Sequence, residues 1–210
     1  MSEILGKLEK PEAEKFKTGR KLYLVPLVFA KKDSPKEYVE KVEQYWKQVG
    51  EHLANLEGKI GKIKKIYHES NSFSGEQGLN VIQQINEKVY PLIKEKCDQG
   101  AEMQATEDLE LFTQSLDWGN CLRVVMTQTV FQKISEFFWE ISTKRFSHIA
   151  QRIDETLGEN EAGALFISEG HSVQFSPNIQ IFYVSPPILD EIRRWFREKA
   201  KENDSADQDS

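Results

Sequence analysis

The chain has 210 residues, of which 39% are hydrophobic and 30% charged, and its formal net charge at pH 7 is −6. A chain of this length and composition can bury a substantial core without staples, which argues against an intrinsically disordered protein. The acidic balance argues against a general binder of nucleic acid or anionic membranes, although it leaves room for a local basic patch.

The first residues, MSEILGKLEKPEAEKF, carry a charge every second or third residue and lack the apolar stretch of a signal peptide. Nowhere do about 18 apolar residues follow one another, so we expect no membrane span. The two cysteines, Cys97 and Cys121, form no CxxC motif and have no adjacent histidine. These features predict a cytoplasmic protein without a disulfide framework.

The first predicted strand is the apolar run KLYLVPLVF at residues 21–29, which is typical of a strand buried on both faces. Pro26 has no N–H to donate, so this strand is expected to lie at an edge, to contain a bulge or to be shorter. The stretch SPKE then predicts a helix with Ser34 as its N-cap and Glu37 closing a capping box. Apolar residues spaced three and four apart continue this helix to Gly58.

Residues 62–68 predict a short second strand. With the strand and helix before it, this strand makes a βαβ unit with parallel strands and a right-handed crossover. The following residues, about 75–158, show helical patterns only, which we interpret as a helical insertion. Pro91 is expected to kink or split the first of its helices, and Thr106 to cap the second.

The longest predicted helix runs from Val130 to Leu157, with apolar residues recurring at a period close to 3.6. Phe137, Phe138 and Trp139 follow one another in it, so they cannot all point inward. We expect Trp139 to face another helix, solvent or a second subunit, and a homodimer is one expectation that follows.

Strand patterns return at residues 162–168 and 179–185, and Ser185 with two prolines opens a final helix. The sequence thus predicts a mixed, mostly helical α/β fold with a small sheet of about four strands (21–29, 62–68, 162–168, 179–185). We expect a single domain over residues 1–200 and a disordered acidic tail over 201–210. Residues 162–185 also fit a β-hairpin with the loop EGHSVQFSPN, and we favour this interpretation.

One strand-to-helix corner, KIYHESNSFSGEQG at residues 65–78, has the layout in which backbone N–H groups hold an anion. Its small residues Ser72, Ser74, Gly75 and Gly78 are the predicted ligand-binding residues. Neither glycine fingerprint for nucleotides, GxGxxG or GxxxxGK[ST], is present. We therefore favour a solvated turn with Ser or Asn capping over an anion site at this corner.

Histidine and glutamate occur together at two predicted strand ends: His68 with Glu69, and Glu169 with His171. Ligands of α/β sheets bind outside the carboxyl ends of parallel strands, so these four residues would form a candidate catalytic site if the two strands were neighbours. Their chemistry suits acid/base hydrolysis or a divalent metal. However, no metal-ligand spacing such as HExxH is present, and we assign no metal residue. If 162–185 is a hairpin, His171 lies in an exposed turn instead.

We therefore expect a cytoplasmic binding or interaction domain for a protein partner or a small anionic ligand, and the sequence identifies no cofactor. The alternative is a hydrolase or metal-dependent enzyme using the four His and Glu residues. A weaker alternative is RNA association through basic clusters at residues 59–65 and 193–201, against which the net charge argues.

Overall fold

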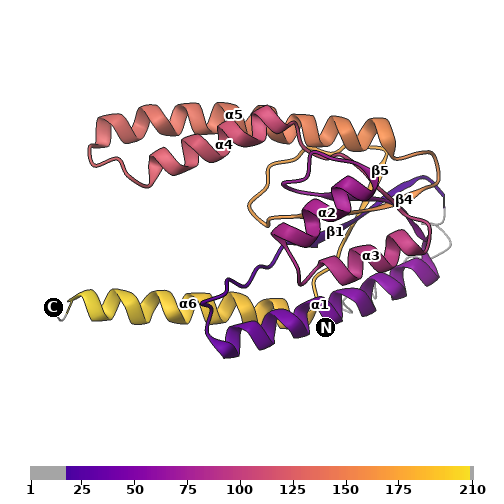
Figure 1. Ribbon diagram of the computed structural model, residues 1–210, viewed down its shortest axis with the longest axis horizontal. Helices are drawn as coiled ribbons and strands as arrows, with labels where there is room; N and C mark the ends of the chain where they lie inside the picture. The colour runs from indigo at the N-terminus through magenta and orange to yellow at the C-terminus, as the bar shows by residue number, and fades with distance from the viewer. Residues whose placement is uncertain (1–17, 209–210) are drawn as a thin grey trace, which may run out of the picture.

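The structure is a computed structural model that describes residues 18–208, with side-chain surroundings described as far as Lys201. In this part of the chain, six helices surround one parallel sheet with the strand order β3-β2-β4-β1-β5 (Figure 1). The predicted α/β class is confirmed, and the sheet has five strands rather than about four.

The strands are β1 (Arg20–Pro26), β2 (Ile63–His68), β3 (Glu102–Met103), β4 (Ala162–Ile167) and β5 (Ile179–Tyr183). Strand β1 ends at Pro26, as expected for a residue that cannot donate to the ladder. Strand β3 lies within the stretch predicted to be helical. Its two residues are too few to produce a periodic pattern in the sequence.

The helices are α1 (Lys36–Lys59), α2 (Gly75–Ile85), α3 (Tyr90–Asp98), α4 (Leu109–Leu122), α5 (Gln128–Thr156) and α6 (Pro187–Gln208). Pro91 lies in the first turn of α3, so the predicted split of the helical pattern is confirmed. Helix α6 is described to Gln208, past residue 200, where the domain is predicted to end. None of the described helices is long and apolar enough to cross a membrane.

Strand β4 lies between β1 and β2 and pairs in parallel with both. Strand β5 pairs in parallel with the other side of β1. The favoured hairpin over 162–185 is therefore wrong, because β1 separates β4 from β5 and all three strands run in the same direction. The loop between them, residues 168–178, therefore returns from the carboxyl end of β4 to the amino end of β5, and it buries Val173 in the core under α5 on the way. An antiparallel hairpin needs only a short turn.

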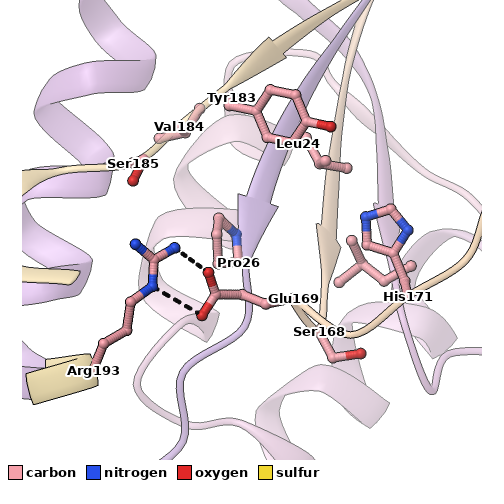
Figure 2. A pocket seen from close by; sticks show the side chains of 10 residues that line it. Leu24, Pro26, Ser168, Glu169, His171, Tyr183, Val184, Ser185 and Arg193 are labelled. Atoms are coloured by element: carbon pink, nitrogen blue, oxygen red, sulfur yellow. Dashed lines mark hydrogen bonds and ion pairs between the residues drawn. The ribbon is translucent and has the colours of Figure 1, made fainter. Parts of the chain in front are cut away.

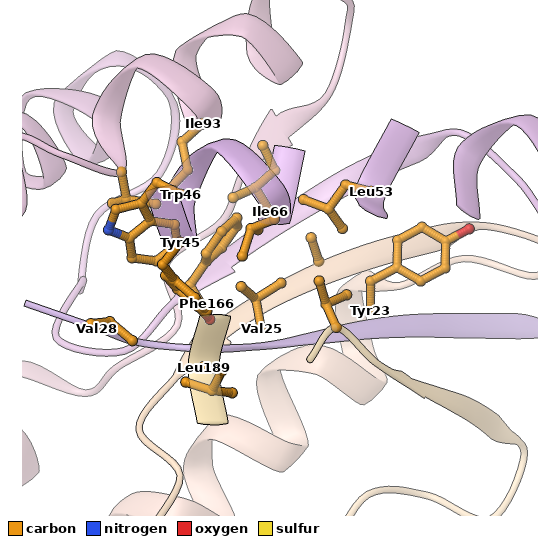
Figure 3. Packing of buried hydrophobic residues seen from close by; sticks show 14 of the residues in the cluster. Tyr23, Val25, Val28, Tyr45, Trp46, Leu53, Ile66, Ile93, Phe166 and Leu189 are labelled. Atoms are coloured by element: carbon orange, nitrogen blue, oxygen red, sulfur yellow. The ribbon is translucent and has the colours of Figure 1, made fainter. Parts of the chain in front are cut away.

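Two cores cover the two faces of the sheet. On one face, α1, α2, α3 and α6 pack on the sheet through residues such as Trp46, Ile93 and Leu189 (Figure 3). On the other face, α5 packs on the sheet through Ile149 and Ile153. Each fully buried side chain of this size stabilises the fold by about 1.5–3 kcal/mol. The helix positions that face the sheet therefore require apolar residues, and this requirement produces the apolar stripes seen in the sequences of α1 and α5.

Two helix starts differ from the prediction. Helix α1 has Pro35 at its N-cap and no side-chain cap, because the Ser34 hydroxyl accepts a hydrogen bond from the Lys31 N–H at 2.9 Å instead. Helix α4 is capped by Asp108, which accepts from the Leu111 N–H at 2.9 Å. The predicted cap, Thr106, is buried, and its hydroxyl accepts from the His68 N–H.

Helix α4 and residues 128–140 of α5 form an antiparallel pair, which we name the arm. Figure 1 shows that the arm projects past the sheet and that only the second half of α5 lies over it. The buried residues of α5 agree with this, because all of them lie at or beyond Ile141.

Candidate functional site

The carboxyl ends of β2 and β4 are neighbours, with His68 paired to Phe166 in the register of the two strands. This arrangement brings the two predicted His/Glu corners to one edge of the sheet. It is the edge at which parallel α/β sheets bind their ligands.

A pocket of about 330 Å³ lies at this edge, outside the ends of β1, β4 and β5 (Figure 2). Its apolar part comes from strand ends, and its polar part from the loop after β4 and from α6. A mostly apolar cavity of this volume with a few convergent polar groups is typical of a small-molecule site. The lining residues are Leu24, Pro26, Ile167, Ser168, Glu169, His171, Tyr183, Val184, Ser185 and Arg193.

An ion pair between Arg193 of α6 and Glu169 forms one side of the pocket (Figure 2). Arg193 Nη1 also donates to Asp190 at 2.6 Å. The hydrogen bond to Glu169 is the main reason that the pKa of Arg193 is raised above its usual range. The structure describes bonds for three of the five N–H donors of this guanidinium, so two remain for a ligand.

His171 lies across the pocket from Arg193 in Figure 2. Its Nδ1 accepts a hydrogen bond from the Val173 N–H at 3.2 Å, so the neutral ring carries its proton on Nε2. Burial lowers the pKa of His171, and the charge of Glu69 offsets this only in part. His171 is therefore suited to donate a hydrogen bond from Nε2 and is poorly suited to accept a proton as a general base.

His68 lies away from this pocket. Its side chain has no exposed surface and stacks on Phe166 of β4, with 6.2 Å between the ring centroids. Nδ1 donates to the Glu69 carbonyl, whereas Nε2 is buried without a partner in the described chain. Burial lowers the pKa of His68 to about 4. His68 is thus a neutral core residue rather than a member of the pocket.

Glu69 is held in a buried network instead of lining the pocket. It accepts hydrogen bonds from the Ser168 N–H at 2.7 Å and from Arg145 Nη2 at 2.9 Å. Arg145 also binds Glu107 through Nε and Nη2, and its guanidinium lies between the rings of Phe112 and Phe146. The network therefore joins β2, β4 and the base of the arm.

The strand ends thus bring Glu169 and His171 into one pocket, place Glu69 next to it through Ser168, and leave His68 in the core on the opposite face. Among the side chains described between residues 18 and 201, no group of three or more His, Cys, Asp or Glu residues could hold a metal ion.

The corner at residues 65–78 is an ordered turn before α2. Ser74 is the N-cap of α2 without a side-chain cap bond, and Gly75 has a positive φ of 59°. Gly78 is buried, and a Cβ there would collide with the Phe73 carbonyl oxygen. A second cavity beside Ser74 and Gly75 is lined by the acidic residues Glu76 and Glu102. Anion binding by Ser72, Ser74, Gly75 and Gly78 stays a prediction.

The two basic clusters lie at opposite ends of the sheet. Residues 59–65 span the end of α1 and the start of β2, whereas residues 193–201 lie on α6 beyond the carboxyl edge. Lys65 is paired with Glu102, and Arg193 with Glu169. The two clusters therefore do not form one continuous basic surface.

Comparisons with protein-family models, with curated proteins and with solved structures give no match, so function is argued from this geometry alone. The pocket residues that sequence reasoning missed are Arg193, which it assigned to a basic cluster, and Tyr183 and Ser185. The sequence offered one signal for these residues, because Ser185 ends a predicted strand and directly precedes a predicted helix.

Proposed function

We propose that this protein is a binding domain whose ligand is a small molecule with an apolar body and an anionic group. The ligand occupies the pocket at the carboxyl edge of the sheet. Its apolar body lies on Leu24, Ile167 and Val184, and its anionic group lies between His171 and Arg193.

The observation that carries this proposal is the pair of donors across the pocket. His171 presents Nε2–H because its Nδ1 is already an acceptor, and Arg193 has N–H groups beyond those bound to Glu169 and Asp190. Hydrogen bonds from a cationic guanidinium to an anion are about twice as strong as neutral ones. Glu169 fixes the position of the Arg193 guanidinium through their ion pair, so the remaining N–H groups are already placed for the anionic oxygen of the ligand.

The same geometry argues against the hydrolase alternative. A general base needs a free lone pair facing the substrate, and the one lone pair of neutral His171 accepts from Val173. Both carboxylate oxygens of Glu169 already accept hydrogen bonds from Arg193, so neither is free to face a substrate as a base.

The test is to titrate phenylacetate into the full chain and to monitor binding through the amide and side-chain NMR signals. Phenylacetamide, titrated in the same way, is the uncharged counterpart. We expect phenylacetate to shift the signals of His171 and Arg193, and phenylacetamide to bind at least about tenfold more weakly because it lacks the charge.

Arg193→Ala and His171→Phe are expected to weaken phenylacetate binding. Arg194→Ala is the matched control, because Arg194 is the next residue of α6 and does not line the pocket. Equal binding of the acid and the amide, or binding that Arg193→Ala leaves unchanged, would contradict the proposal.

A further inference from the structure

The arm concentrates the exposed apolar side chains of the described chain. Of twelve large apolar side chains that are exposed, eight lie on residues 109–139: Leu109, Leu116, Val124, Met126, Val130, Phe131, Phe137 and Trp139. Scattered exposed apolar residues are ordinary on a protein surface, but a cluster of this kind marks an interaction site.

The arm also lacks a core of its own. No residue of α4 or of the first half of α5 belongs to either core cluster, and Ser115 is the one buried residue of α4. Two antiparallel helices can bury only the seam between them. In bundles, a second pair of helices covers the remaining apolar surface.

One side of the arm has a single charged residue, Arg123, which lies at the tip where α4 ends. On α4, Leu109, Phe112, Leu116 and Gly119 follow the spacing of a single helix face. The ring of Phe138 lies beside Gly119, 3.5 Å from where a Cβ would be, and Trp139 packs edge-on against Phe138. We name this surface the Trp139 face; it consists of Leu109, Phe112, Leu116, Gly119, Phe131, Ser135, Phe138 and Trp139.

Apart from Arg123 at the tip, the charged residues of the arm lie off this face. The stack of Trp118 on Phe137, with centroids 5.0 Å apart, marks the opposite side. Helical spacing places Glu110 and Asp117 of α4 and Lys133 of α5 on that opposite side. There Lys133 pairs with Glu136 of its own helix, as on a solvated surface.

The apolar composition of the Trp139 face restricts which partner can cover it. Away from Arg123, a charged partner surface would lose its hydration without gaining an ion pair, which costs free energy. The segment outside the structure, residues 1–17, is a poor match because eight of its 17 residues are charged. The same face of a second copy carries one charge, at the tip of its arm, and is otherwise uncharged; apolar interface cores are typical of homodimers.

We infer that two copies of this chain associate through their Trp139 faces, so that the two arms form a four-helix bundle around a two-fold axis. Such an interface is isologous, with each Trp139 and Leu116 buried against the partner's arm. This inference is independent of the ligand proposed for the pocket, because the arm contributes no residue to that pocket.

The test is sedimentation velocity of the full chain, at concentrations up to about 100 μM because association depends on concentration. We expect a species of twice the 24.3 kDa chain mass. Leu116→Glu and Trp139→Glu are each expected to raise the dissociation constant at least about a hundredfold, since each buries an unpaired charge in the bundle.

Phe137→Glu is the matched control. Phe137 is on the same arm and is 46% exposed, close to the 51% of Leu116, but it lies on the opposite side. This variant is expected to stay dimeric, with circular dichroism confirming that all three variants keep their helices. A wild-type monomer, a dimer that survives Trp139→Glu and Leu116→Glu, or a dimer that Phe137→Glu breaks would each overturn the inference.

Discussion

His68 makes a quantitative prediction about stability and pH. The ring is completely buried, and its pKa in the folded protein is about 4, compared with an ordinary value of 6.5. Protonation would place a charge at Nε2, where the described chain offers no acceptor. The folded state therefore resists protonation over a pH range in which the unfolded chain accepts a proton.

The sign follows from linkage. Above pH 6.5 both states are neutral at this residue, and its contribution to stability is fully present. As the pH falls from 6.5 towards 4, the unfolded state binds a proton that the folded state does not, so the free energy of unfolding decreases. At 1.36 kcal/mol per pKa unit, the full loss is about 3 kcal/mol.

Urea denaturation of the wild type and of His68→Gln, measured at intervals between pH 7.5 and 4, separates this effect from the titration of carboxyl groups. The wild type is expected to lose about 3 kcal/mol more than His68→Gln, because the variant cannot take up this proton. His52→Gln retains His68 and should follow the wild type.

His68→Gln removes a buried hydrogen bond, so a second measurement on the wild type provides a readout that does not depend on the stability of the variant. The NMR signals of the His68 ring are expected to stay those of the neutral Nδ1–H form down to about pH 4. A His68 ring that titrates near 6.5 in the folded protein would refute the reasoning.

Two further predictions concern packing and charge. Arg145→Met leaves Glu69 and Glu107 without their cation and is expected to lower the free energy of unfolding by about 3–5 kcal/mol in urea denaturation. Lys144→Met, at an exposed neighbouring residue, is the control and should lower it by under about 1 kcal/mol. Equal losses in the two variants would contradict the assigned network. Gly78→Ala should lower the melting temperature, because the new Cβ would collide with the Phe73 backbone and lie 3.0 Å from Met103 Cγ. Gly58→Ala is the control, since a Cβ there has open space within α1 and should stabilise the helix by up to about 1 kcal/mol. A melting temperature that Gly78→Ala leaves unchanged would show that the turn before α2 adjusts to accept the methyl group.

Hydrophobic periodicity predicted the elements that bury a continuous stripe. The stripe of α1 that includes Trp46 and Leu53 and the stripe of α5 that includes Ile149 and Ile153 both face the sheet. The apolar runs of β1 and β4 belong to central strands, which are buried on both faces. Such patterns come from local spacing alone, so a single sequence is sufficient to show them.

Strand order depends on contacts that local spacing does not encode. The parallel arrangement of β4 and β5 on either side of β1 requires a loop that returns from the carboxyl end of the sheet to its amino end. Nothing in the ten-residue segment EGHSVQFSPN distinguishes that path from a hairpin. The position of Glu169 and His171 directly after a strand could be predicted from the local pattern, whereas Arg193 reaches the pocket from α6 and could not be placed without the fold.

The partly buried carboxylate of Glu69 connects both proposed binding surfaces. One oxygen accepts from the Ser168 N–H at the pocket, and the other accepts from Arg145, which also holds Glu107 at the base of the arm. Its partners are 76 and 99 residues away along the chain, so no local motif announces the network. Substitutions at Arg193 and Trp139 leave this network intact. Each therefore perturbs its own surface, and loss of ligand binding and loss of the dimer are expected to occur separately.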